Sequence, residues 1–335
     1  MREYFRPLVQ TGPMTSAECR PLAGGACWFD TVEVLSRDAA PRRIAAAAVP
    51  GEVLVHLTTP RAGSGGLLYE RPQVMGILNV TPDSFSDGGD FVAADAALEQ
   101  ARAMDADGAD IIDIGGESTR PGAAPVTPEE EAARVCPLIL ALAGQGIGPI
   151  SVDTRNASTA RAALAAGAQV FNDVSALSHD PMSAEVAAQS TAALCLMHAQ
   201  GDPETMQANP RYADVLLDVY DYLAERIAVA EAAGVERRRL IVDPGIGFGK
   251  TLAHNLALLR GVSLFHGLGV PILVGASRKR FIGELADAPE PKERLAGSLA
   301  VAVMAAQQGV QVLRVHDVAP TVQALKVAQA IDHGI

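Results

Sequence analysis

Short apolar runs alternate with longer amphipathic segments from residue 74 to the C-terminus, and this alternation constrains the fold more than any other feature. Apolar runs bounded by polar residues are typical of buried strands, and the intervening segments have the length and periodicity of helices. Strands are predicted at residues 74–78, 111–114, 150–153, 170–173, 193–197, 240–243, 272–275 and 312–315. Helices are predicted at residues 93–107, 128–143, 157–166, 182–189, 212–233, 252–259, 291–308 and 321–331.

Eight β/α units in residues 71–335 have the size of an α/β protein of the (β/α)8 TIM-barrel class. The alternative is a doubly wound open sheet, which gathers its ligand groups at one switch point. Polar or charged residues follow nearly every predicted strand, and this favours the barrel, because all eight carboxyl ends then meet at one mouth.

Residues 1–70 lack the regular alternation of the later chain and are predicted to form an N-terminal extension of a few short strands. Strand-like pieces lie at residues 29–35 and 52–58, and the glycine-rich stretch 63–66 is typical of a loose connector. The sequence predicts no function for this extension, which packs on the barrel or is partly mobile.

Charge and composition exclude several classes of partner. The formal net charge is -12, so nucleic acid and anionic membrane surfaces are not expected. The four cysteines have neither the number nor the spacing of a disulfide framework. No apolar run approaches the ~18 residues of a membrane span, and there is no apolar leader segment, so a cytoplasmic location is expected.

The first predicted strand opens into a polar loop that runs to Gly89. Asn79 lies at the strand tip, and residues 82–89, which include Asp83, form a predicted lid that is poorly ordered without ligand. Asn79 offers a neutral oxygen that Mg²⁺ accepts when phosphates supply further ligands. After the second strand, Thr119 and Arg120 lie in a glycine-rich loop and offer donors to an anion.

Three later strand ends carry groups that suit a hydrogen-bonding ring. Asp153 and Asn172 end the third and fourth strands, and a carboxylate with an amide can grip an aminopyrimidine edge. Asp243 ends the sixth strand, and Phe248 follows it in a loop that lacks the first glycine of a P-loop. Asp173 is interpreted instead as the cap of the next helix.

The last two strand ends are basic. Ser277, Lys279 and their neighbours form a cationic turn after the seventh strand, which is either a solvated turn or a place for an anion. Arg314 and His316 face the same side of the eighth strand, and both can donate to a phosphate-type anion. Asp317 is interpreted as the cap of the last helix.

These motifs together resemble those of bacterial dihydropteroate synthases, the pterin-binding enzymes of folate synthesis that sulfonamides inhibit. The resemblance covers the chain from residue 74 onward and leaves residues 1–70 unassigned. The matching stretches are residues 75–89, 113–122, 151–154, 172–173, 196–198, 243–250, 275–279 and 314–318.

The resemblance implies a (β/α)8 barrel that condenses 6-hydroxymethyl-7,8-dihydropterin pyrophosphate with p-aminobenzoate. It implies that Asp153, Asn172, Asp243 and Lys279 bind the pterin ring, with Met197 and Phe248 packed beside it. Asn79 would bind Mg²⁺, Thr119 would lie near the pyrophosphate, and Ser277 would receive the p-aminobenzoate carboxylate. The residues assigned to catalysis or to the pyrophosphate oxygens are Asp83, Arg120, Lys279, Arg314 and His316, and the loops that carry Asp83, Phe85 and Pro121 would close over the site.

Two other functions remain open from the sequence. A methyltetrahydrofolate:corrinoid methyltransferase would share the pterin-binding groups but would not need the basic pyrophosphate set. A non-catalytic pterin-binding paralogue usually loses its loop residues, which are retained here. The family is commonly homodimeric through barrel helices, and the apolar run 299–306 could serve that contact or simply face the core.

Overall fold

An eight-stranded parallel sheet forms the body of the molecule. The structure is a computed structural model that describes residues 2–80, 89–117, 126–201 and 206–333, except for the side chains of residues 89–93 and 333. The order of the strands is β11-β10-β9-β8-β7-β6-β13-β12. A parallel bridge between Val242 and Ile272 brings the two edge strands together and nearly closes the barrel. The strands are β6 (Gln73–Asn79), β7 (Ile111–Gly115), β8 (Ile150–Asp153), β9 (Val170–Asp173), β10 (Ala193–Met197), β11 (Leu240–Asp243), β12 (Leu273–Val274) and β13 (Val312–Val315).

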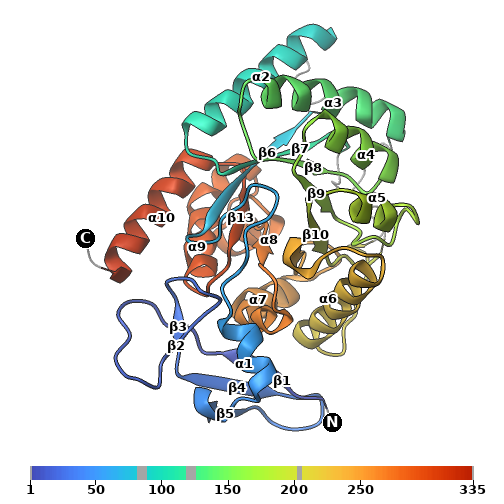
Figure 1. Ribbon diagram of the computed structural model, residues 1–335. Helices are drawn as coiled ribbons and strands as arrows, with labels where there is room; N and C mark the ends of the chain where they lie inside the picture. The colour runs from blue at the N-terminus through green and yellow to red at the C-terminus, as the bar shows by residue number, and fades with distance from the viewer. Residues whose placement is uncertain (1, 81–88, 118–125, 202–205, 334–335) are drawn as a thin grey trace.

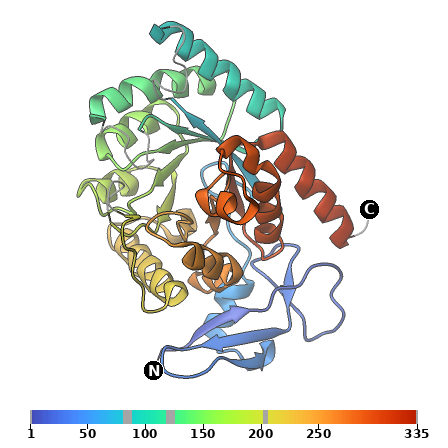
Figure 2. The ribbon, with the colours of Figure 1, turned by 180° about the vertical axis from the view of Figure 1, so that it is seen from behind.

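Helices surround this sheet, as Figures 1 and 2 show from opposite sides. They are α2 (Gly89–Ala106), α3 (Pro128–Gly144), α4 (Ala157–Ala166), α5 (Ser183–Gln189), α6 (Val215–Ala232), α7 (Leu252–Arg260), α8 (Arg280–Ala286), α9 (Leu295–Ala306) and α10 (Val318–His333). The prediction of a TIM barrel is therefore confirmed. Because strands and helices pack through their apolar faces, one continuous outer core joins them, while a second cluster fills the barrel interior.

Helix boundaries follow local capping chemistry. Thr127 and Glu130 form a reciprocal capping box with Pro128 at the first turn of α3, as the sequence predicts, and such a cap is worth about 1 kcal/mol. The predicted helices differ from the observed ones in one region. The helix predicted over 291–308 begins as a 3-10 turn, Pro291–Arg294, before α9, and α8 was not predicted.

The N-terminal extension packs against the side of the barrel, beside α6 and the 3-10 segment Val262–Leu268 (Figure 1). It contains β1 (Tyr4–Pro7), β2 (Arg20–Pro21), β3 (Trp28–Phe29), β4 (Thr31–Leu35), β5 (Arg42–Ala45) and α1 (Gly51–Thr58). The strand predicted at 52–58 is wrong, because α1 occupies it. There Leu57 is fully buried in the core of the extension, so packing overrides the β propensity of its valines.

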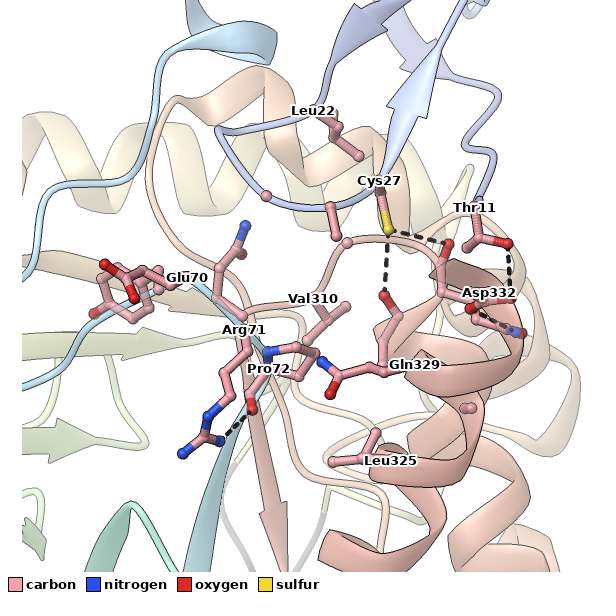
Figure 3. A pocket seen from close by; sticks show the side chains of 18 residues that line it. Thr11, Leu22, Cys27, Glu70, Arg71, Pro72, Val310, Leu325, Gln329 and Asp332 are labelled. Atoms are coloured by element: carbon pink, nitrogen blue, oxygen red, sulfur yellow. Dashed lines mark hydrogen bonds between the residues drawn. The ribbon is translucent and has the colours of Figure 1, made fainter. Parts of the chain in front are cut away.

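The extension is tied to the barrel by polar contacts. The hydroxyl of Tyr4 donates to Asp221 on α6 at 2.7 Å, and Arg37 pairs with both Asp218 and Asp221. Figure 3 shows the other side of this junction, where the Cys27 thiol donates to two carbonyls at the end of α9. A cavity of about 70 Å³ lies beside these contacts, at the amino ends of β6 and β13.

The stretch at 63–66 is not a loose connector, which corrects that prediction. A Cβ on Gly65 would lie 2.4 Å from the carbonyl oxygen of Gln169, so the backbone here is packed directly under the barrel. Leu67 and Tyr69 then enter the cluster that fills the barrel interior, where Leu67 is 1% exposed. This segment closes the lower end of the barrel and leaves the upper mouth to the ligand groups.

Candidate active site

The carboxyl ends of the strands bring the predicted ring-binding and anion-binding groups to one mouth. Met197, at the end of β10, is buried among them. The described residues with predicted roles are Asn79, Asp153, Asn172, Met197, Asp243, Phe248, Ser277, Lys279, Arg314 and His316. The predicted roles of Asp83, Phe85, Thr119, Arg120 and Pro121, and the predicted lid up to Gly88, lie outside the described residues.

A buried ion triad forms the floor of this mouth. The Nε of Arg314 donates to Asp113 and one terminal nitrogen donates to Asp153, both at 2.6 Å. Asp113 is completely buried and also accepts a longer bond from the amide of Asn172, at 3.3 Å. These contacts modify the prediction for Arg314, since two of its nitrogens hold carboxylates of β7 and β8 instead of facing an anion alone.

Asp113 belongs to this charged set, although the sequence motifs predicted no role for it. Its one signal was a charge inside an otherwise apolar strand, which is costly unless the charge is paired. The partner lies 201 positions away in the sequence and is brought close only by barrel closure.

Burial sets the protonation of the Asp153 carboxyl in the triad. Desolvation raises the pKa of Asp153 to about 7, and the guanidinium of Arg314 opposes that rise. Near neutral pH the Asp153 carboxyl can therefore either donate or accept a hydrogen bond. Such a group suits the amide and amine edge of a planar heterocycle.

Asp243 and Lys279 form a second charged set across the mouth. Asp243 accepts from the backbone N–H of Gly245 at 2.7 Å, and burial raises its pKa while the charge of Lys279 lowers it. Burial lowers the pKa of Lys279 to about 7, against the opposing effect of Asp243. The ammonium of Lys279 donates to the carbonyl of Ile246 and lies 4.3 Å from the ring centroid of Phe248.

The basic turn after β12 resolves into three different environments. Arg278, at φ 57°, pairs with Asp317, and the exposed Arg280 pairs with Glu284. Only Lys279 turns toward the other charged groups of the mouth, so the turn is neither wholly solvated nor wholly an anion site. The carboxylate of Asp317 forms an ion pair with Arg278, so the interpretation of Asp317 as only a helix cap is corrected.

Ser277 and His316 contact one another across the last two strand ends. The Ser277 oxygen accepts from the backbone N–H of His316 at 3.2 Å and lies 3.1 Å from its Nδ1. Ser277 is nearly buried, at 6% exposure, so this pair is positioned as a unit.

Asp173 has a structural role, but it does not cap a helix. Its carboxylate accepts from Ser175 and from the N–H of Leu177 at 2.7 Å, which stabilises a tight turn with left-handed backbone at Ala176 and Leu177. The helix α5 begins only at Ser183. The prediction of a helix cap is therefore corrected to a turn cap.

Asn79 lies half-buried at the tip of β6, with its side-chain oxygen over Gly115. A Cβ on Gly115 would lie 3.4 Å from that oxygen, so glycine leaves room there. Among the described residues no cluster of three His, Cys, Asp or Glu side chains could hold a metal by itself. A divalent ion at Asn79 would thus need ligands from a bound substrate, as Mg²⁺ often takes from phosphates.

Comparison with known proteins identifies the family. Residues 75–316 match the family described as pterin binding enzyme. The chain is 51% identical over 259 residues to the dihydropteroate synthase of Escherichia coli K12, covering 77% of this chain and 91% of that protein. It is 48% identical over 276 residues to the dihydropteroate synthase of Neisseria meningitidis serogroup B, covering 81% and 96%.

Solved structures of dihydropteroate synthases are also similar to this chain. The dihydropteroate synthase of Xanthomonas albilineans with 4-aminobenzoic acid is 50% identical and has a TM-score of 0.75, covering 79% of this chain and 94% of that chain. The same enzyme in complex with 7,8-dihydropteroate is 47% identical, with a TM-score of 0.73 over 79% and 95% of the two chains. The matched regions include every described residue of the mouth from β6 to His316. The chain therefore belongs to the pterin binding enzyme family, among the dihydropteroate synthases.

Proposed function

We propose that this chain joins 6-hydroxymethyl-7,8-dihydropterin pyrophosphate to p-aminobenzoate, giving 7,8-dihydropteroate and pyrophosphate. The observation that carries the proposal is 51% identity to a dihydropteroate synthase over 91% of its length, with the ring-binding groups at one mouth. The chain is a transferase that works on two small molecules. Sulfonamides are expected to inhibit it, since a related enzyme from Yersinia pestis, 47% identical, has been solved with such a drug.

The described residues recognise and orient the pterin. Asp153 and Asn172 face one edge of the ring, and their acceptor and donor atoms match its amide and amine groups. Asp243 and Lys279 hold the opposite side, where the ammonium of Lys279 also contacts the Phe248 ring. Holding the ring on rigid strand ends fixes the methylene carbon where the second substrate arrives.

The reaction is a substitution at that methylene carbon. The carbon–oxygen bond to pyrophosphate breaks, and both electrons leave with the oxygen. The lone pair of the aniline nitrogen forms the new carbon–nitrogen bond, and its proton passes to solvent or to the released pyrophosphate. Positive charge grows on the methylene as the bond breaks, and the buried carboxyl groups Asp153 and Asp243 stabilise it.

Donors around the departing pyrophosphate complete the proposal. His316 and Arg120 are assigned to its oxygens, and Thr119 and Asp83 to the loops around it. Ser277 is assigned to the carboxylate of p-aminobenzoate. Arg314 contributes to the pyrophosphate site while it holds Asp113 and Asp153 in place.

Mg²⁺ is proposed as the metal of this site, with Asn79 as its protein ligand. The neutral oxygen of Asn79 and the space over Gly115 fit an ion that takes its other ligands from pyrophosphate and water. When bound, the ion offsets the negative charge of the leaving group. Chelation with EDTA should reduce turnover, and added Mg²⁺ should restore it.

We also propose that the chain forms a homodimer through α9 and α10. All twelve residues of α9 are uncharged, yet Met304 is 63% exposed on its outer face. Val327 and Ile331 on the adjacent α10 are 56% and 78% exposed. Exposed apolar side chains on two adjacent helices suit an interface between copies of the chain.

The location proposed for the chain is the cytoplasm. All four cysteines, Cys19, Cys27, Cys136 and Cys195, are free thiols, which suits a reducing compartment. Within the described ranges, none of the helices combines the length and the apolar character that crossing a bilayer requires.

One assay tests the function. Pyrophosphate release is measured with both substrates and with either one omitted, and it should require both. Methyl transfer from methyltetrahydrofolate to a corrinoid would indicate the methyltransferase. Pterin binding without pyrophosphate release under these conditions would indicate a non-catalytic paralogue.

A further inference from the structure

A buried lysine next to the mouth has no assigned role. Lys250 follows the glycine-rich loop 244–250 between β11 and α7, and it is 3% exposed. No carboxylate in the described part of the chain lies within ion-pair distance of its ammonium. Removing a lysine side chain from water is unfavourable, so its hydrogen bonds must offset that desolvation cost.

Burial lowers the pKa of Lys250 well below its usual value, and the charge of Asp243 opposes this shift. In the ammonium form its three donors have three acceptors. They are Nδ1 of His198 at 2.9 Å, the carbonyl oxygen of His198 at 3.3 Å and the carbonyl oxygen of Phe248 at 2.9 Å. Lys250 thus joins the end of β10 to the loop after β11. One of its acceptors belongs to the residue whose ring contacts Lys279.

His198 is arranged to accept from Lys250. Its ring packs edge-on against Tyr222 at 4.8 Å between centroids, so its orientation is fixed. Burial and the charge of Lys250 lower the pKa of His198 to about 3. The imidazole is therefore neutral at pH 7, and accepting from the Lys250 ammonium at Nδ1 requires the tautomer with its proton on Nε2.

The loop itself needs external support. Gly245, Gly247 and Gly249 have φ of 68°, 84° and 61°, and a Cβ on Gly245 would lie 1.8 Å from the His198 carbonyl oxygen. Glycines permit this close approach but add no side-chain contacts of their own. The carbonyl of Ile246 in this loop also accepts from Lys279, so the loop conformation sets the position of that ammonium.

We propose that Lys250, held by His198, is a positioning residue that fixes the 244–250 loop so that Phe248 and Lys279 stand ready to bind the pterin ring. The inference deepens the proposed function and rests on it for its ligand. Lys250 acts through the backbone and does not touch the substrate. Its loss should weaken ring binding more than it slows the chemical step.

The first test compares Lys250→Met with the control Lys292→Met, which removes an exposed lysine. Titration calorimetry with the dihydropterin pyrophosphate should show binding at least tenfold weaker for Lys250→Met only. Its KM for the same substrate should rise by a similar factor, while kcat stays within about threefold. Unchanged affinity in a folded Lys250→Met variant would overturn the proposal.

We call the hydrogen bond between Lys250 and Nδ1 of His198 the clamp. A second pair of variants tests whether this bond, or only the packing around His198, fixes the loop. His198→Asn places its amide oxygen where Nδ1 lies and retains the acceptor, whereas His198→Leu removes it. Both variants lose the ring contacts with Tyr222 and Tyr212. Affinity should stay within about threefold for His198→Asn and fall at least tenfold for His198→Leu. Equal affinities in the two variants would contradict the clamp, even if Lys250→Met does not fold.

A ligand-free measurement keeps this inference separate from the proposed function. Amide hydrogen exchange of the peptide covering 244–250 should be at least tenfold faster in His198→Leu than in His198→Asn. Equal exchange would overturn the clamp. Failure of the wild-type chain to bind the pterin would instead refute the proposed function, and the exchange comparison would still decide the role of the clamp.

Discussion

Replacing Arg314 with Met tests the ion triad at the floor of the mouth. The side chain of Arg314 is 18% exposed and bridges Asp113 and Asp153, which are 0% and 11% exposed. Removing it leaves two buried carboxylates without their cation. Breaking a buried ion pair in this way costs roughly 3–5 kcal/mol.

The expected shift in Tm follows from the size of the protein. Unfolding entropy near roughly 2.1 cal/mol/K per residue gives about 0.7 kcal/mol/K for 335 residues. Each kcal/mol therefore lowers Tm by roughly 1.4 °C, and the variant should melt about 4–7 °C below wild type at pH 8.

The loss of stability should depend on pH. The pKa of Asp153 is raised above its unfolded value to about 7, so its favourable contribution is complete at low pH and is lost as pH rises through 7. At pH 5.5 this carboxyl is mostly protonated in wild type, so the arginine contributes less. The deficit should then shrink to about half of its pH 8 value.

Thermal unfolding followed by circular dichroism at pH 5.5 and pH 8 measures both effects. The control is Arg280→Met, which removes an ion pair whose arginine side chain is 87% exposed. Such a surface pair contributes no more than about 0.5 kcal/mol. A deficit for Arg314→Met that is equal at the two pH values, or no larger than the control, would refute the coupling of Arg314 to Asp153.

Three further predictions concern separate parts of the molecule. Asp153→Asn should abolish pterin binding and leave the fold intact, and a calorimetric titration with wild-type affinity would contradict the assignment of Asp153. Leu67→Ala should cost about 2–5 kcal/mol because the residue is 1% exposed in the barrel interior, with pterin affinity unchanged. The adjacent Leu68→Ala is its control at 62% exposure and should cost less than about 0.5 kcal/mol in urea unfolding. Met304→Glu should convert the proposed dimer to a monomer in light scattering. The control Leu140→Glu, also at a residue that is 63% exposed, should leave the dimer intact. A wild-type chain that is monomeric would contradict the proposed dimer.

The positions of the barrel strands were determined by the sequence alone. An apolar run between polar residues must be buried on both faces, so each predicted strand lies within one or two residues of its observed bounds. The strand ends follow from these runs, which is why Asp153, Asn172 and Asp243 were predicted to share one mouth. The specific motifs around them were sufficient to predict the family.

Only the tertiary structure decided what those charges contact. The pairing of Arg314 with Asp113 joins residues 201 positions apart, and the Lys250 clamp joins residues 52 apart, so no local pattern encodes either one. Likewise, the glycines at 63–66 resemble a flexible connector until the barrel closes over them. Local sequence fixes which segments are apolar and how they repeat, whereas the partners of buried charges and close-packed glycines depend on distant segments that meet only in the folded chain.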